Sequence, residues 1–418
     1  MKTIIISPVF LTLLSFSNLL GSTTETILSP HDFEAIANSA YVSFNKELEN
    51  APADITLGLA DIKYNHGTFK IIECGNGQHS GIRRHSIYIN NKECTQETPY
   101  WSIIEHLLNT YKLPVWFVGQ LPFQSFQPFL RPPHDKHRPS TFDNLIAALG
   151  PDIHKNIPLP KPKTIREHTG IVLYRAPSRN SQQSPVFSAF SNNFLHFVLI
   201  NSLSSRYFHS KDATYRLFED AGLHNYIPDY AIYPARYNQK LAQEIIARFP
   251  STAMFIIKPL NQSRARGVSV VAAENLNTHL QHLFGTTPFA PKETKSIGYW
   301  RTSKDTHCII SEFVPSQKVT YENIVYEPTM RIIFLMTHEC GKVTVHILGG
   351  CWKVPPYGIT DDSANLTEQY ATNPDIHGTE IRVIIEEEEL TTMKDVVAPV
   401  LAQAYKTILK QSMEHDGK

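Results

Sequence analysis

The sequence predicts an α/β protein in which both strands and helices occur along the whole chain. Residues 60–64 and 68–74 are rich in β-forming residues and lie close enough to pair as a hairpin. A second pair of β-rich stretches, 253–259 and 268–272, flanks a polar loop. Residues 386–410 begin with acidic and end with basic side chains, a charge order that favours a helix.

The first hairpin carries one acid on each strand. Its turn, residues 65–67, ends in Gly67, which is free to adopt positive φ. Antiparallel pairing is expected to bring Asp61 and Glu73 together. Magnesium prefers a few oxygen ligands and keeps the rest of its coordination for water and phosphates, so the two acids with the amide oxygen of Asn76 form a candidate metal site. The alternative is a surface hairpin whose acids are simply solvated.

The second hairpin places a lysine at the end of an apolar strand. Lys258 is costly to bury unless an anion faces it, and phosphate is a common one. The loop that follows has a flexible backbone and two arginines, which suits a cover over phosphate oxygens. The residues concerned are Ser263, Arg264, Arg266 and Gly267. The loop lacks the Gly-Lys-Ser/Thr ending of the common phosphate loop.

A third apolar stretch, residues 307–312, ends at Glu312 and is followed by Phe313, Val314 and a proline. The end of such a strand offers backbone donors and acceptors beside apolar side chains. This combination suits the binding of an adenine ring, with Glu312 or Gln317 reaching the ribose or the amino group.

At these residues the chain resembles the ATP-grasp superfamily. The similarity runs through Ser-Lys211-Asp, Lys258-Pro, Ser-Glu312-Phe-Val and Pro-Thr-Met-Arg331. The acidic hairpin precedes Lys258 here, as in circularly permuted members similar to glutathionylspermidine synthetase. The resemblance therefore implies an α/β (α+β) fold of ATP-grasp type, circularly permuted, with an additional α/β domain.

The resemblance also implies roles for matching positions. Lys211 and Lys258 would contact the phosphates of ATP, and Arg331 and Lys353 would stabilise the transferred phosphoryl group. The other implied positions are the loop from Ser263 to Gly267 over the phosphates, Glu312 to Val314 at adenine, and Asp61, Glu73 and Asn76 at magnesium. One departure matters: the family pattern is Glu-X-Asn, whereas this chain reads Glu73-Cys-Gly-Asn76.

The function implied is that of an ATP- and magnesium-dependent ligase that activates a carboxylate as an acyl phosphate for attack by an amine or related nucleophile. Both substrates stay open and include small molecules, peptides and proteins. A kinase-type phosphotransferase uses the same ATP-handling residues and is the alternative. A catalytically inactive nucleotide-binding protein is a third reading, favoured by the altered Glu-X-Asn pattern.

Composition limits the partners and the chemistry. Lys plus Arg and Asp plus Glu both number 39, so net charge gives no indication of nucleic acid binding. The five cysteines are an odd number without the spacing of a disulfide framework. No Ser/His/Asp order or nucleophile elbow supports a hydrolase.

The N-terminal residues 1–22 resemble a secretory signal peptide, and a buried first strand in a cytoplasmic protein is the alternative. Export would place the protein in an ATP-containing compartment such as a host cell, and no stable membrane anchor is expected. Helices are expected at 32–49 and 101–111. The predicted domains after the signal segment are a helix with the acidic hairpin (23–98), an α/β domain (99–210), a nucleotide-binding lid (211–320) and a second ATP-grasp subdomain with the C-terminal helix (321–418).

Overall fold

The computed structural model describes residues 54–76, 87–89, 92–94, 115–119, 168–175, 194–201, 203–204, 207–208, 210–260, 265–285, 295–339, 341–372 and 381–416. Three predicted elements lie outside these residues: the export segment at 1–22 and the helices at 32–49 and 101–111. Among the helices of the described part, none is long and apolar enough to cross a bilayer.

The chain divides into two compact units that interleave along the sequence. One unit comprises residues 1–57, 96–203 and 336–344, and the other comprises 58–95, 204–335 and 345–418. The five-part division expected from the sequence stays a prediction.

In the first unit, three strands form a parallel sheet in the order β5-β6-β7. Their bounds are Val115–Gly119, His168–Arg175 and Phe194–Leu199. Parallel strands need crossover connections, which is the arrangement of an α/β unit.

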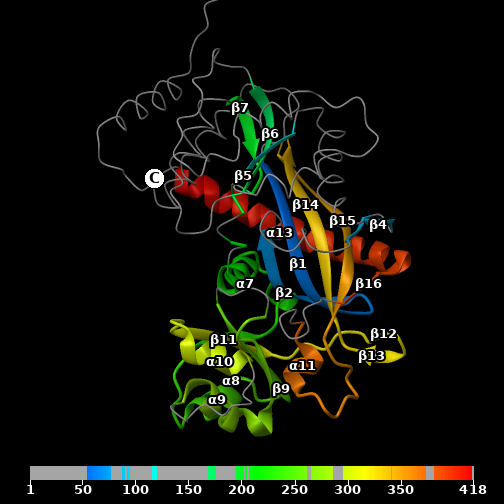
Figure 1. Cartoon of the computed structure of the whole chain (residues 1–418). Helices are drawn as coiled ribbons and strands as arrows, with labels where there is room; N and C mark the ends of the chain where they lie inside the picture. The colour runs from blue at the N-terminus through cyan, green and yellow to red at the C-terminus, as the bar shows by residue number, and fades with distance from the viewer. Residues whose placement is uncertain are drawn as a thin grey trace, which may run out of the picture. The chain divides into compact units, whose positions relative to one another are not determined.

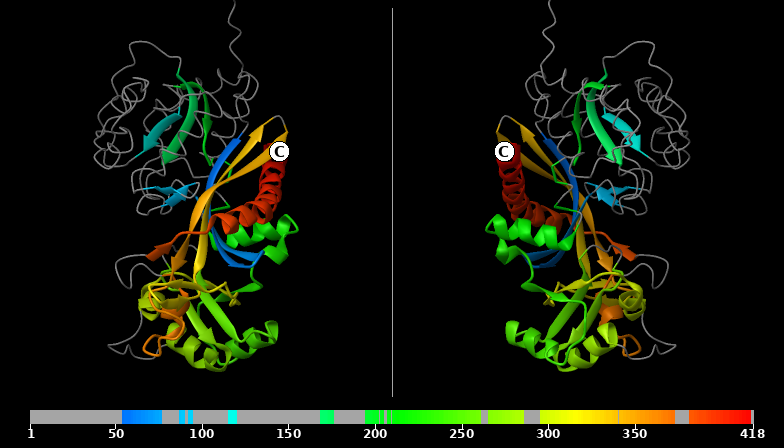
Figure 2. Two further views of the ribbon diagram at one scale, coloured as in Figure 1. Left: turned by 90° about the vertical axis from the view of Figure 1, so that its right-hand side faces the viewer. Right: turned by 90° about the vertical axis from the view of Figure 1, so that its left-hand side faces the viewer.

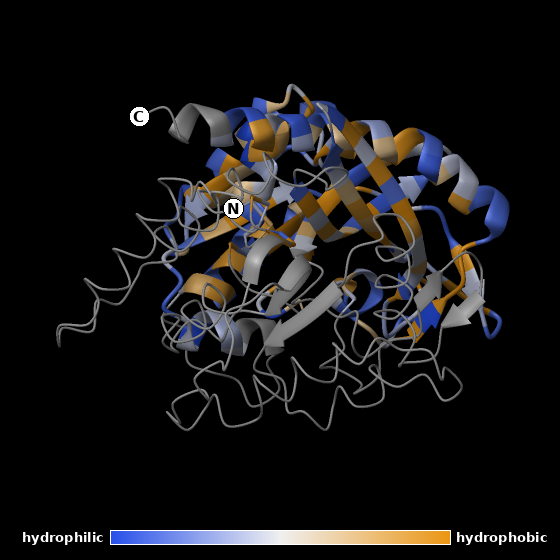
Figure 3. Cartoon of the chain, turned by 90° about the horizontal axis from the view of Figure 1, so that it is seen from above, coloured by the Kyte–Doolittle hydropathy of each residue, from blue (hydrophilic) through white to orange (hydrophobic). Residues whose placement is uncertain are grey.

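The largest sheet has seven strands in the order β2-β1-β14-β15-β3-β4, with β16 paired to β15 (Figure 1). Their bounds are β1 Asp54–Asn65, β2 Thr68–Asn76, β3 Ile87–Ile89, β4 Lys92–Cys94, β14 Thr329–Glu339, β15 Lys342–Val354 and β16 Ile381–Val383. Strands from the start of the chain therefore pair directly with strands that form more than 250 residues later, since Asp61 and Arg331 on adjacent strands are 270 positions apart. Figure 3 shows apolar residues in orange along these strands.

Two helices of the second unit, α7 (Lys211–Asp220) and α13 (Glu387–Asp416), lie on the same face of this sheet (Figure 2). They are joined by a 2.7 Å hydrogen bond from Gln403 Nε2 to the carbonyl of Ala221. Both bury apolar side chains, among them Leu217, Phe218, Leu401 and Tyr405. The predicted C-terminal helix is confirmed and extends beyond its predicted end.

A second, antiparallel sheet has the order β10-β9-β11-β8. Its strands are β8 Tyr230–Pro234, β9 Met254–Pro259, β10 Ser269–Ala272 and β11 His307–Glu312, and its helices are α8 Leu241–Arg248, α9 Leu276–Phe284 and α10 Lys295–Thr302. An apolar core that includes Phe255, Ile257, Leu280 and Ile310 joins them. The predicted order of strand, loop and strand around Lys258 is confirmed by the pairing of β9 with β10.

Short elements complete the described chain. They are the 3-10 helices η4 His224–Tyr226 and η5 Ala273–Asn275, the hairpin of β12 Val319–Tyr321 and β13 Ile324–Tyr326, and helix α11 Leu366–Tyr370. The described structure is thus a mixed α/β fold. The strand pairs of the seven-, four- and two-stranded sheets whose register is defined are antiparallel.

Candidate functional site

The acidic hairpin forms as the sequence predicts. Its two-residue turn has His66 at φ 44° and Gly67 at φ 88°, and positive φ at both positions matches the twist of paired strands. In the resulting register Asp61 is the cross-strand partner of Glu73. Cross-strand partners share a face of the sheet, so the predicted juxtaposition of the two acids is confirmed.

Asp61 is held by two cations from neighbouring strands. Arg331 on β14 donates from Nε to Asp61 Oδ1 at 2.6 Å and from Nη2 to Oδ2 at 2.8 Å. Lys353 on β15 donates to the same Oδ2 at 3.0 Å. A bidentate guanidinium–carboxylate pair fixes both position and plane, so this contact orients Arg331 as well as neutralising Asp61.

The charges around Asp61 dominate its protonation. Burial by itself raises the pKa of this carboxyl group. The positive charges and hydrogen bonds of Arg331 and Lys353 outweigh burial and hold the pKa well below its ordinary value of 3.8. Asp61 is therefore ionised throughout the physiological range.

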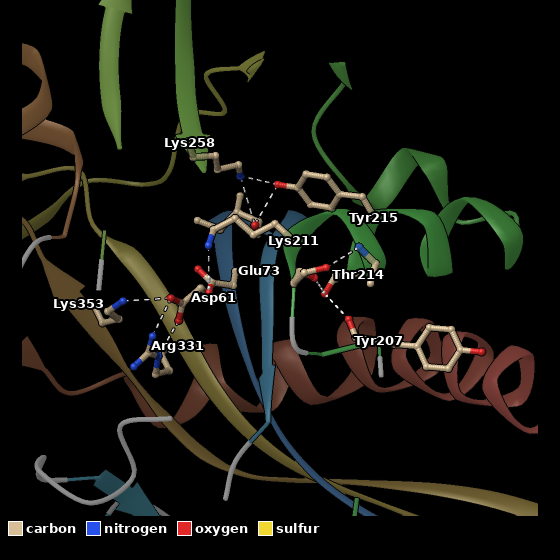
Figure 4. A network of polar contacts seen from close by, with 12 residues as sticks. Asp61, Glu73, Tyr207, Lys211, Thr214, Tyr215, Lys258, Arg331 and Lys353 are labelled. Atoms are coloured by element: carbon tan, nitrogen blue, oxygen red, sulfur yellow. Dashed lines mark hydrogen bonds and ion pairs between the residues drawn. The ribbon is translucent and has the colours of Figure 1, made fainter. Parts of the chain in front are cut away.

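These residues form a charged row across four adjacent strands. Glu73 lies on β2, Asp61 on β1, Arg331 on β14 and Lys353 on β15, in the order in which the strands pair. Figure 4 shows the side chains converging on Asp61. Arg331 and Lys353, expected to stabilise a phosphoryl group, thus lie in one row with Asp61 and Glu73, two of the three residues expected to face a metal.

Lys211 approaches this row from the start of α7. The hydroxyl of Ser210 caps the helix by accepting a 3.1 Å bond from the amide of Ala213, which fixes Lys211 as the first helical residue. Its Nζ lies 3.5 Å from Glu73 Oε1. The Glu73 side chain retains 38% of its exposed surface, so solvent reaches the row at this carboxylate.

Lys258 reaches the same region from β9 of the other sheet. Its Nζ donates to the hydroxyl oxygen of Tyr215 at 2.6 Å and lies 3.4 Å from the carbonyl oxygen of Ile72. Tyr215 in turn donates to that carbonyl at 2.9 Å. The register of the hairpin shifts beyond Asp61 and leaves Ile72 without a partner on β1, a bulge that turns its carbonyl from the ladder to these side chains.

The surroundings of Lys258 weaken its hold on a proton. Burial, followed by repulsion from Lys211, lowers the pKa of Lys258 to about 7, against a smaller opposing attraction from Glu73. The described residues place no carboxylate within ion-pair distance of its Nζ. A bound anion would restore its charge.

Lys63 is a cation that sequence reasoning missed. It lies on β1 two positions from Asp61 and is as buried as Lys211, Lys258 and Lys353, each at 6% exposure. Its Nζ donates to the carbonyl of Pro328 at 3.2 Å and lies 5.7 Å from the centre of the Phe313 ring. Burial lowers its pKa to about 8, while the charge of Glu327 acts in the opposite direction. The alternation of side chains along a strand could have indicated Lys63, because positions 61 and 63 lie on the same face of β1.

The residues expected at adenine lie at the end of β11. The amide of Phe313 donates to the carbonyl of Met254 at 2.9 Å, and its ring packs 5.0 Å from that of Tyr370. Glu312 Oε1 accepts from the amide of Asp229 at 3.0 Å and lies 3.3 Å from Lys70 Nζ. Val314 follows in the same segment and is partly buried. Their role at adenine stays a prediction.

Of the predicted phosphate loop, Ser263 and Arg264 lie outside the described residues. Arg266 is exposed, and Gly267 adopts φ +71°. A Cβ added at Gly267 would stand 2.3 Å from the ring of Tyr299. The carbonyl oxygen of Gly267 accepts a 2.7 Å hydrogen bond from Trp300 Nε1. Helix α10 therefore fixes the end of the loop.

The donor set fits magnesium at one carboxylate of the pair. Glu73 is partly open and, among the described residues, makes one ion pair, with Lys211, whereas Asp61 is enclosed by Arg331 and Lys353. Asn76 ends β2 opposite Gly58, and an odd offset of three positions assigns it to the other face from Glu73. Within the described ranges, no three His, Cys, Asp or Glu residues gather as a metal-binding group.

No family of protein sequences matches the chain, and no curated protein does. Among solved structures, it is similar to a D-cycloserine synthetase at 12% identity, covering 72% of this chain and 82% of that one, with a TM-score of 0.32.

Two further similar structures are a D-alanyl-alanine synthetase A from Vibrio cholerae and a glutathione synthetase-like effector from Globodera pallida. The first has 10% identity, covers 58% of this chain and 59% of that one, and has a TM-score of 0.31. The second has 10% identity, covers 77% and 79%, and has a TM-score of 0.32. Identities and TM-scores this low do not establish the family or the activity of this chain.

Proposed function

We propose that this protein binds ATP beside the charged row and acts as an ATP-dependent ligase of the ATP-grasp type. The observation that carries the proposal is the convergence of five buried or largely buried cationic side chains on a few carboxylates. Lys63, Lys211, Lys258, Arg331 and Lys353 face Asp61, Glu73 and Glu327. An excess of buried positive charge is costly without an anion, and a triphosphate supplies several negative charges at once.

The proposed roles follow from position. Lys211 and Lys258 come from two different elements and would hold phosphate oxygens between them. Arg331 and Lys353, oriented by Asp61, would stabilise the negative charge that develops on the phosphoryl group during transfer. Glu73 would hold a magnesium ion, which supplies charge neutralisation to the bound triphosphate. The acceptor in a ligase is a carboxylate, and the resulting acyl phosphate is attacked by an amine or related nucleophile.

A kinase-type reaction would use the same ATP-handling residues, so product analysis distinguishes a kinase from a ligase. The purified protein is incubated with ATP, magnesium and pools of carboxylates and amines, followed by phosphate detection and mass spectrometry. A ligase releases phosphate only when both co-substrates are present, whereas a kinase leaves it on the acceptor.

The nucleotide site is tested separately by calorimetric titration with ATP. Replacing Lys258 by Met should weaken binding by about tenfold or more, because a charged contact to phosphate is lost. Lys240→Met is the matched control, since Lys240 is exposed at the start of α8. Equal affinities of the two variants would contradict the proposed site.

A further inference from the structure

We propose, resting on the ATP site above, that Asp61 is a positioning residue for Arg331 and Lys353 and does not ligate a divalent cation. Glu73 is then the carboxylate of this pair that reaches a metal carried by the triphosphate. The two acids are cross-strand partners, yet the residues around each of them differ, and so do their proposed roles.

Lone-pair count separates the two acids. An ionised carboxylate offers about four acceptor positions on its two oxygens. At Asp61 three N–H groups occupy three of them, at 2.6, 2.8 and 3.0 Å. At Glu73 the ion pair within reach is the 3.5 Å contact to Lys211. Glu73 thus retains acceptor capacity that Asp61 has already used.

Charge separates them in the same direction. A metal on Asp61 would stand beside both the guanidinium of Arg331 and the ammonium of Lys353, and like charges repel strongly where water is excluded. The Asp61 side chain is 8% exposed and that of Glu73 is 38% exposed. A hydrated magnesium ion therefore meets less repulsion and less desolvation at Glu73.

The geometry gives Asp61 a different task. Its bidentate contact sets the plane of the Arg331 guanidinium, and its second oxygen also holds Lys353. One carboxylate thereby links three neighbouring strands and holds two cations at a fixed spacing.

The test uses Mn²⁺ as the metal probe, because its electron paramagnetic resonance signal reports binding directly. Titrations with and without ATP are made on the full-length protein and on Glu73→Gln, Asp61→Asn and the double variant Asp61→Asn with Arg331→Gln. The double variant removes the charge of both Asp61 and Arg331, so that, among the described residues, Lys353 is the one cation that loses its contact to a carboxylate at position 61, which lowers the risk of misfolding.

We expect Glu73→Gln to weaken Mn²⁺ binding in the presence of ATP by about tenfold or more, because a direct ligand is removed. The double variant should bind ATP about tenfold more weakly both with and without Mn²⁺, because the oriented cations are lost, while the factor by which Mn²⁺ strengthens ATP binding stays within about threefold of that of the wild type. Removal of a metal ligand would instead reduce that factor.

Loss of Mn²⁺ from the double variant, with ATP binding retained, would overturn the assignment of Asp61 alone. A wild-type protein that binds no ATP by calorimetric titration, with or without Mn²⁺, would overturn the ATP site itself and this inference with it. The two failures are therefore distinguishable.

Discussion

Lys258 and Tyr215 are joined by a 2.6 Å hydrogen bond from the ammonium nitrogen to the phenol oxygen, across 43 positions of sequence. The same nitrogen lies 5.0 Å from the centre of the tyrosine ring. A lysine held by neutral acceptors keeps little of the stabilisation that an ion pair would give. Burial and the charge of Lys211 lower the pKa of Lys258 to about 7, and this contact supplies a neutral acceptor in place of an ion pair.

Lys258 should make stability depend on pH. Its pKa falls from 10.5 to about 7 on folding, so the unfolded chain binds more protons between these values. Stability should therefore rise with pH across this window, by at most about 1.4 kcal/mol per pH unit from this group. Urea unfolding of the wild type and of Lys258→Met at pH 7 and pH 9 checks this. Only the wild type should show the added slope, and identical slopes would contradict the assignment.

Tyr215→Phe should destabilise the protein by about 1–3 kcal/mol, because the carbonyl of Ile72 loses a buried donor and Lys258 loses its acceptor. Tyr237→Phe is the control, since the hydroxyl of Tyr237 makes an exposed 3.3 Å bond to Asn277. Chemical denaturation of both variants measures the difference. A loss no greater than that of the control would show that the buried network contributes little.

Asp61→Asn should cost about 3–5 kcal/mol, because it leaves two buried cations without their anion. Glu73→Gln should cost about 1 kcal/mol or less, since its ion pair is long and partly exposed. The folded-state pKa of Asp61 is depressed, so its contribution is present above pH 3.8 and is lost as the pH falls further. Denaturation at pH 7 and pH 3 measures both effects, and equal costs for the two variants at pH 7 would refute this account.

Gly267→Ala should destabilise the β9–β10 region more than Gly222→Ala. Both glycines have φ +71°, so both substitutions carry the same backbone strain of about 1–2 kcal/mol. At Gly222 nothing lies within 4 Å of an added Cβ, whereas at Gly267 the Tyr299 ring lies at 2.3 Å. The difference in unfolding free energy therefore measures the packing of α10 on the loop. Equal losses of unfolding free energy in the two variants would mean that α10 shifts at no measurable cost.

The sequence predicted several local features because they depend on neighbouring residues. Turn chemistry at Gly67 fixed the hairpin and the pairing of Asp61 with Glu73. Apolar β-rich runs located β9, β10 and β11, and the charge order of the last residues located α13. The same local logic did not reveal Lys63, whose surroundings come from Pro328, Phe313 and Glu327.

By itself, then, the sequence determined the acidic hairpin, the strands on either side of the Lys258 loop, the C-terminal helix, and which acids face each other across the hairpin. Only the tertiary structure decided which cations those acids meet. Arg331 and Lys353 bond to Asp61 because β14 and β15 follow β1 in the sheet, a pairing that closes a loop of more than 250 residues. Propensity and periodicity act over a few residues, whereas strand order is set by burial of the whole sheet, and the charge of each carboxylate's surroundings follows from that order.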